Sequence, residues 1–196
     1  MKNIQFPLNF QFKILTPSND FSVLDTQGNE VAYTRQKIFK LKEGIEIFRN
    51  SSRQERLYQI NADRILDFNA CYKITNEQGL ELGSIRRSGM RSLWQTHYEI
   101  FGANSLKLYD IQETNPWISV LDGLLGEVPI LGMFTGYFFN PSYTITDTQG
   151  KQDYLLQKEA SLLERKFSLQ KTGNAANDEL VTLSCMMLML MERADG

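Results

Sequence analysis

A short phrase recurs along the chain and predicts a series of β-hairpins. It reads FSVLDTQG at 21–28, YKITNEQG at 72–79 and YTITDTQG at 143–150. An aromatic and a β-branched residue stand two apart, so both lie on one face of a strand. The Asp or Asn starts a turn, and the Gly takes the positive φ that closes it. The phrase therefore predicts antiparallel strand pairs.

Two further segments vary the phrase. YEIFGANS at 98–105 has Asn-Ser in place of Gln-Gly, and IEIFRNSS at 45–52 carries another turn signal. The copies are unequally spaced, which does not suit a regular solenoid or propeller. Many short strands with turn signals between them are typical of a sandwich or a barrel. We therefore predict a mainly β protein.

The composition limits the kinds of protein that this chain can be. The chain has 196 residues, of which 42% are hydrophobic, and no low-complexity linker divides it, so we expect one domain spanning 1–196. A net charge of −2 gives no general attraction to nucleic acid. The two cysteines, without CxxC spacing, suit a reducing cytoplasm, and the N-terminal residues do not resemble a signal peptide.

The segment 180–191 is apolar or small throughout and holds four of the seven methionines. Asn177, Asp178 and Glu179 before it form a good helix start. As a helix the segment is about 18 Å long, whereas a bilayer core is about 30 Å thick. Membrane insertion and partner docking remain alternatives, but an all-round apolar helix is normally buried. We therefore predict a closed antiparallel β-barrel wrapped around a central C-terminal helix.

Several phrases in order resemble one family. They are NPW at 115–117, GEVPILG at 126–132, GYFFNPSY at 136–143, and the Met/Leu tail that ends in Glu192 and Arg193. Together they are similar to the Tubby C-terminal-like superfamily, in particular to small bacterial LURP-one-related or phospholipid scramblase-like members. The resemblance covers nearly the whole chain. It implies a barrel of about twelve strands around one central helix.

The resemblance also bears on function. Scramblase-like activity is associated with a calcium-binding segment and an acylated cysteine cluster, and this sequence has no D-x-D-x-D-G run and only the isolated Cys71 and Cys185. Tubby proteins bind phosphoinositide head groups through basic residues of the barrel. Those residues do not map one by one onto this chain. The resemblance therefore favours binding over lipid scrambling.

Basic residues recur after the repeated turns. Seven or eight residues beyond each Gly stand Arg35, Arg86, Arg87 and Lys158, and Arg91 follows with Trp94 nearby. In equivalent hairpins these side chains would gather at one rim, opposite the Gln-Gly turns. Such a rim is suited to a lipid phosphate. The alternative is that they are ordinary solvated residues that protect strand ends.

No catalytic or metal-binding motif stands out, and we expect no cofactor. His97, the only histidine, alternates with Tyr98 and Ile100, which predicts a plain surface residue on the outer face. The residues Asp63 and Asp67 lie in strand-like sequence and are expected to be exposed. Cys185 is interpreted as a small buried hydrophobe. The apolar segment 117–131, beginning at Trp117, is expected to pack on the barrel, with a membrane surface or a second subunit as alternatives.

These observations predict a non-catalytic binding domain. Its expected ligand is an anionic phospholipid head group at the membrane surface, which would place it in the cytoplasm and peripheral to the membrane. The alternative is a protein-interaction or regulatory scaffold with an unknown protein partner and no lipid role. Neither function involves nucleic acid or a transmembrane span.

Overall fold

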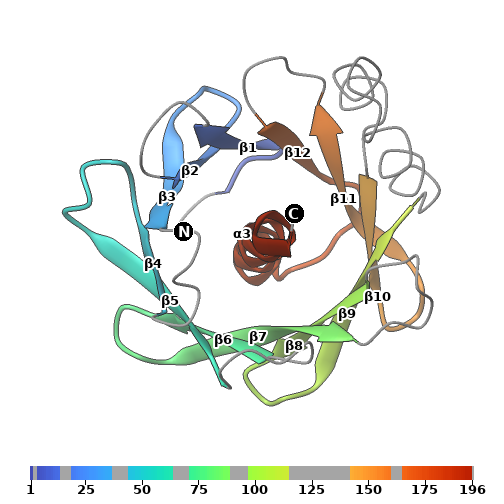
Figure 1. Ribbon diagram of the computed structural model, residues 1–196. Helices are drawn as coiled ribbons and strands as arrows, with labels where there is room; N and C mark the ends of the chain where they lie inside the picture. The colour runs from blue at the N-terminus through green and yellow to red at the C-terminus, as the bar shows by residue number, and fades with distance from the viewer. Residues whose placement is uncertain are drawn as a thin grey trace.

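The computed structural model describes residues 1, 4–13, 19–36, 44–63, 71–88, 97–114, 142–159 and 165–195. In these residues twelve antiparallel strands form a closed barrel around one helix (Figure 1). Each strand pairs with its neighbours in sequence, and β1 pairs with β12 to close the sheet. The predicted architecture is therefore confirmed.

The strands are short and regularly arranged. They are β1 (Leu8–Lys13), β2 (Asn19–Leu24), β3 (Glu30–Gln36), β4 (Ile45–Phe48), β5 (Arg56–Ala62), β6 (Cys71–Asn76), β7 (Glu81–Ser88), β8 (His97–Gly102), β9 (Lys107–Glu113), β10 (Ser142–Asp147), β11 (Gln152–Glu159) and β12 (Arg165–Lys171). The helix α3 (Asp178–Asp195) follows all of them.

The repeated phrase forms the same turn in each of its three copies. In the first, Oδ1 of Asp25 accepts hydrogen bonds from the backbone N–H groups of Gln27 and Asn29 at 2.8 and 2.9 Å. Gly28 then adopts a φ of 83° and donates its N–H to the carbonyl oxygen of Asp25. The side chains of Asn76 and Asp147 accept equivalent pairs of bonds. The turn chemistry predicted from the sequence is confirmed.

The two variant phrases also form hairpins. Ser105 takes the place of the Gly with a φ of 60°, and Arg53 does so in the longer β4–β5 loop with a φ of 58°. All five loops lie at the end of the barrel where the helix begins. We call this the hairpin end, made by residues 25–29, 49–55, 76–80, 102–106 and 147–151, and the opposite end the distal end.

Each hairpin contains one β-bulge at the same place. The register shifts directly after the inward β-branched residue, for example between Val23 and Leu24. The extra residue on the returning strand is apolar in four hairpins and packs against the core; these residues are Val31, Leu57, Leu82 and Leu108. In the β10–β11 hairpin the extra residue is Asp153, which is buried. Its carbonyl oxygen accepts hydrogen bonds from Thr172 and Gly173, where the chain turns toward the helix.

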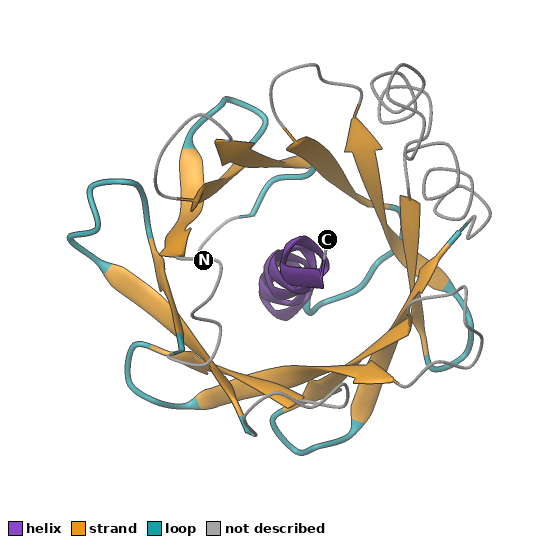
Figure 2. Ribbon diagram, viewed as in Figure 1, coloured by secondary structure: helices purple, strands orange, loops and turns teal. Residues whose placement is uncertain are grey.

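The helix α3 is the axis of the barrel (Figure 2). Every residue from 180 to 191 is buried, and the wall supplies inward aromatic and β-branched side chains around it. The interpretation of this segment as a core helix is thus confirmed. Among the described residues there is no helix whose length and apolarity would let it cross a membrane. Burial raises the pKa of the Cys185 thiol, which behaves as a small apolar side chain.

Three inward tyrosines hold the start of the helix against the wall. The hydroxyl of Tyr154 donates to Asp178, and the side-chain amide of Asn177 donates to the hydroxyl of Tyr109 at 3.3 Å. The hydroxyl of Tyr58 donates to the carboxylate of Glu179. These polar contacts set the position of the helix along the barrel axis, which apolar packing alone leaves poorly specified.

Candidate anion-binding rim

Four of the five predicted basic residues lie at the distal end. Arg35 stands near the end of β3, Arg86 and Arg87 near the end of β7, and Lys158 near the end of β11. The fifth, Arg91, lies outside the described residues, as do Trp94, Asp67 and the segment 117–131. In the closed strand order, β3, β7 and β11 are each four strands apart. The basic residues therefore form a ring around the barrel rather than a single patch.

Strand alternation divides this ring between two faces. Arg87 is opposite Tyr98, and Lys158 is opposite Phe167, so both occupy inward-facing positions and are half-buried. Arg86 is opposite Glu99 on the outer face, and so is exposed. Adjacent residues of a strand point to opposite sides of the sheet. Arg86 and Arg87 therefore point to opposite sides of the barrel wall, although both lie near its distal end.

The outward arginine of β3 is paired. Nε of Arg35 lies 2.9 Å from Oδ1 of Asp20, directly across from it on β2. Hydrogen bonding to this buried carboxylate raises the pKa of Arg35. Its side chain is nevertheless 45% exposed, so part of the guanidinium remains accessible to a ligand.

The outward arginine of β7 belongs to a chain of charges across three strands. Arg86 lies 2.6 Å from Glu99, and Lys107 lies 3.0 Å from Glu99 and 2.7 Å from Asp110. Burial raises the pKa of Glu99, but the hydrogen bonds from Arg86 and Lys107 outweigh it and the net pKa is lowered. The guanidinium of Arg86 also stacks 4.8 Å from the ring centre of Phe101. Arg86 is thereby held in one orientation at the surface.

The histidine at the end of this row of charged side chains corrects one prediction. His97 is only 7% exposed, and its Nε2 lies 2.6 Å from Oδ1 of Asp110. The interpretation of His97 as a plain surface histidine is therefore wrong, although its side chain does alternate with Tyr98 as expected. The error arose because an outward position was equated with an exposed one.

Several charged residues of this region were missed at the sequence level. Glu99, Lys107 and Asp110 form the charge chain, and Glu113 is a buried acid opposite Tyr143 at the distal end of β9. Alternation along β8 and β9 would have placed Glu99 and Asp110 on the outer face. Their partners depend on strand register, which the bulges shift by one residue. In the described part of the chain, no cluster of three acidic, His or Cys side chains suits a metal ion.

The fold defines a class of protein: a closed twelve-stranded antiparallel barrel with a buried C-terminal helix is the Tubby C-terminal-like architecture. Residues 30–182 match the LURP-one-related family, and the chain belongs to that family. An X-ray structure of a protein from Arabidopsis thaliana has a similar fold, with a TM-score of 0.52 and 11% identity over 96% of this chain and 92% of that one. No curated protein matches in sequence.

Proposed function

We propose that the protein is a non-catalytic binding domain whose distal rim recognises anionic phospholipid head groups. The observation that carries this proposal is the recurrence of basic residues at the same end of β3, β7 and β11. Membership of a family with a Tubby-like fold supports it. We further propose a cytoplasmic protein that associates peripherally with the membrane; the free thiols of Cys71 and Cys185 are consistent with a reducing compartment.

The ring arrangement suits a surface better than a single small ligand. Basic residues spread around the end of a barrel can each approach a different head group of a flat membrane. Each Lys or Arg near an anionic membrane contributes about 1 kcal/mol to binding. The ion pairs of Arg35 and Arg86 do not prevent this, because a guanidinium has five N–H donors and can contact a carboxylate and a phosphate together.

The test is co-sedimentation with vesicles of phosphatidylcholine, with and without phosphatidylserine. We expect binding only to the anionic vesicles, decreasing as salt is raised. The double variant Arg86→Ala/Arg87→Ala should bind several-fold less. A matched control is Arg49→Ala/Arg53→Ala, which removes the same charge at the hairpin end and should bind as the parent protein does.

Two outcomes would overturn the lipid proposal. One is the absence of binding to anionic vesicles at low salt. The other is an equal loss of binding in both double variants, because only net charge would then matter. Either result would leave the alternative function, a protein-interaction or regulatory scaffold without a lipid role.

A further inference from the structure

One junction in the barrel wall is much less complete than the others, the one between the neighbouring strands β3 and β4 (Figure 1). Between these two described strands, only Tyr33 and Phe48 stand in register. Every other junction has four to six such pairs. We call residues 34–36 of β3 and 45–47 of β4 the distal half of the β3–β4 junction. A single pair in register closes the sheet here.

Both strands of this junction are well paired on their other side. Residues 34–36 are each in register with a residue of β2, and residues 45–47 are each in register with a residue of β5. A separation of β3 from β4 along the distal half therefore breaks none of the other register pairs of either strand.

The charged side chains of the distal half are directed away from the junction. If the register of Tyr33 and Phe48 continued, Arg35 would stand opposite Glu46, where opposite charges stabilise a strand pair. Instead, Arg35 pairs with Asp20 of β2 at 2.9 Å, and Glu46 pairs with Arg56 of β5 at 3.1 Å. These ion pairs hold each strand to its outer neighbour and leave the junction itself without their support.

A buried polar side chain lies on the inner side of the junction. Thr34 is 1% exposed and stands opposite the inward Phe21 of β2. Its hydroxyl oxygen, Oγ1, has no hydrogen-bond partner in the described part of the protein. A hydroxyl that is buried without a partner costs free energy. The closed wall bears this cost, whereas water can bond to the hydroxyl when the junction opens.

The repeated hairpin shows that this position does not require a polar residue. The sixth residue after the turn glycine is Thr34 in the β2–β3 hairpin, but it is Ile85 in the β6–β7 hairpin and Leu156 in the β10–β11 hairpin. Both apolar residues are fully buried, and each stands opposite the aromatic residue of its phrase, as Thr34 does. The unsatisfied hydroxyl therefore occurs in the hairpin that borders the incomplete junction.

Side chains hold the same junction together at the hairpin end. The carboxylate of Glu30 accepts hydrogen bonds of 2.8 Å from the backbone N–H of Ser51 and from the hydroxyl of Ser22. Because Ser51 belongs to the β4–β5 loop, Glu30 joins the two sides of the junction. The guanidinium of Arg53 also lies 5.2 Å from the ring centre of Phe48. These contacts favour opening from the distal end.

We propose that the barrel wall opens and recloses along the distal half of the β3–β4 junction, with Glu30 and the Tyr33–Phe48 pair as the hinge. The open form admits water and small solutes to the inner face of the wall beside Thr34, while α3 stays in place. Arg35 lies on the moving edge, so the opening also changes the shape of the basic rim. The opening itself does not depend on lipid binding.

Thiol labelling in the Cys71→Ser background tests the proposal. Ile45→Cys places a thiol on the inner face beside the junction, and the matched control Ile60→Cys places one directly opposite it on β5. Both isoleucines are at most 1% exposed, but Ile60 has a neighbour in register on each side. We expect dithionitrobenzoate to react at least about tenfold faster with Ile45→Cys, because a local opening exposes it without unfolding the barrel.

The β3 edge of the junction has its own probe. Thr34→Cys replaces an unbonded hydroxyl with a thiol of similar size, so this variant should fold as the parent does. Its thiol should react at least about tenfold faster than Cys185 of the same molecule. Cys185 is fully buried in α3 and therefore reports exposure of the helix.

Two further substitutions should shift the opening in opposite directions. Added to Ile45→Cys, Thr34→Val removes the unsatisfied hydroxyl from the closed wall and should slow labelling about fivefold or more. Glu30→Gln weakens the hydrogen bonds that hold the hairpin end of the junction and should speed labelling. The control is Thr144→Val, which removes a hydroxyl from β10, five strands away from β3, and should leave the rate unchanged.

Three results would overturn the proposal. Equal rates for Ile45→Cys and Ile60→Cys would mean that exposure requires unfolding of the whole barrel. Labelling of Thr34→Cys at the rate of Cys185 would mean the same, and an unchanged rate on adding Thr34→Val would remove the assigned role of the hydroxyl. These measurements contain no vesicles, so failure of the lipid proposal is read separately, from Arg86→Ala/Arg87→Ala.

Discussion

The hydroxyl of Tyr154 donates a hydrogen bond of 2.6 Å to Oδ1 of Asp178, which joins the wall of the barrel to the first turn of its central helix. The same carboxylate pairs with Lys171, with Nζ 2.7 Å from Oδ1. Burial raises the pKa of Tyr154, and the neighbouring Asp178 raises it further, so the phenol stays protonated and remains a donor. The helix therefore begins at a defined height in the barrel.

Removing that hydroxyl should destabilise the protein. We expect Tyr154→Phe to lower the free energy of unfolding by about 1.5–3 kcal/mol, the range for a hydrogen bond to a charged group. Urea unfolding measures the change. Tyr109→Phe is the control: its 3.3 Å bond to Asn177 is longer and uncharged, so its loss should cost about 1 kcal/mol or less. Equal effects of the two substitutions would contradict the assigned role of Asp178.

At Gly83 the wall passes close to the helix residue Leu180. A Cβ built there would lie 2.2 Å from the carbonyl oxygen of Phe101 and 2.9 Å from a methyl carbon of Leu180. We expect Gly83→Ala to cost about 3 kcal/mol or more in thermal unfolding, because a backbone atom cannot move aside. Gly79→Ala should cost about 1–2 kcal/mol from its positive φ alone, since nothing lies within 4 Å. If adding Leu180→Ala fully restored Gly83→Ala, the clash with Phe101 would not be the cause.

Met187 tests how tightly the helix fills the barrel. It is fully buried, so Met187→Ala should leave a cavity and cost about 2–5 kcal/mol. Met187→Leu keeps the volume and should cost less than about 1.5 kcal/mol. Both are measured by urea unfolding. A Met187→Ala variant as stable as the parent would mean that the core around the helix is loosely packed.

Glu99 should contribute to stability in a pH-dependent manner. Its folded pKa lies below the ordinary value of 4.5, so its contribution is complete above that value and is lost as pH falls through the folded pKa. We expect Glu99→Gln to lower the free energy of unfolding by about 1–2 kcal/mol at pH 7. The stability of this variant should also fall less steeply than that of the parent protein as the pH is lowered.

The control for Glu99 is Glu46→Gln. Glu46 pairs with Arg56 at 3.1 Å, but its side chain is 47% exposed, so its loss should cost less than about 0.5 kcal/mol. Parallel acid unfolding curves for Glu99→Gln and the parent protein would show that Glu99 is not the titrating group.

The two cysteines should differ in reactivity. Cys71 is half-buried on β6, whereas Cys185 is fully buried and its pKa is raised by burial. Because the thiolate is the nucleophile, we expect iodoacetamide at pH 8 to label Cys71 in the native protein and Cys185 only after denaturation. Mass spectrometry of the peptides distinguishes them. Rapid labelling of native Cys185 would show that the helix leaves the barrel readily.

Local sequence was sufficient to predict the hairpins and the helix, because their signals lie within a few residues. An acceptor such as Asp25 and a positive-φ residue such as Gly28 specify a turn without help from the remainder of the chain. Contacts between strands were harder to predict from the sequence. The pair of Arg86 and Glu99 depends on the register between β7 and β8, the pair of Lys107 and Glu99 depends on the β8–β9 register that the bulge after Ile100 shifts, and His97 is paired with Asp110 of the next strand.

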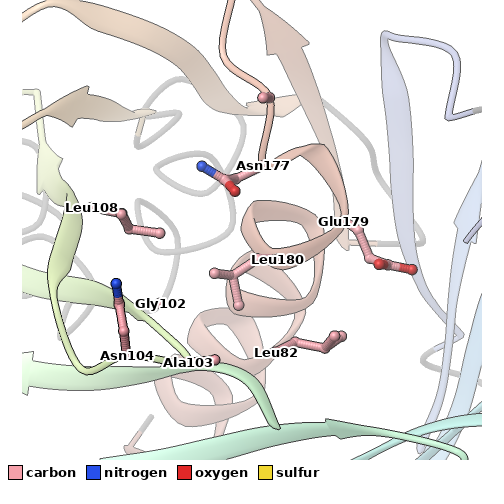
Figure 3. Close-up of a pocket in the computed structure, with 9 residues that line it drawn as sticks. Leu82, Gly102, Ala103, Asn104, Leu108, Asn177, Glu179 and Leu180 are labelled. Atoms are coloured by element: carbon pink, nitrogen blue, oxygen red, sulfur yellow. The ribbon is translucent and has the colours of Figure 1, made fainter. Parts of the chain in front are cut away.

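For the basic residues of the distal rim, the sequence allowed a more detailed prediction than the one made. Arg86 and Arg87 were grouped because they are adjacent, yet a period of two places them on opposite faces. The bulge leucines Leu82 and Leu108 also have a local signal, since each follows a turn by a constant number of residues. The open pocket that Leu82 and Leu108 line together with Leu180 (Figure 3) has no such local signal. It depends on the position of the helix, which only the assembled barrel provides.

The position of α3 after every strand has a consequence for folding. While the chain is being synthesised, all twelve strands are made before the segment that fills their interior. β1 can pair with β12, and so close the sheet, only after β12 has been made, and the inward side chains lack the apolar surface of the helix until residues 180–191 have been made. Contacts so distant in sequence form slowly, and unfinished sheets tend to aggregate. A chaperone that shields nascent strands should therefore raise the yield of this protein more than it raises its final stability.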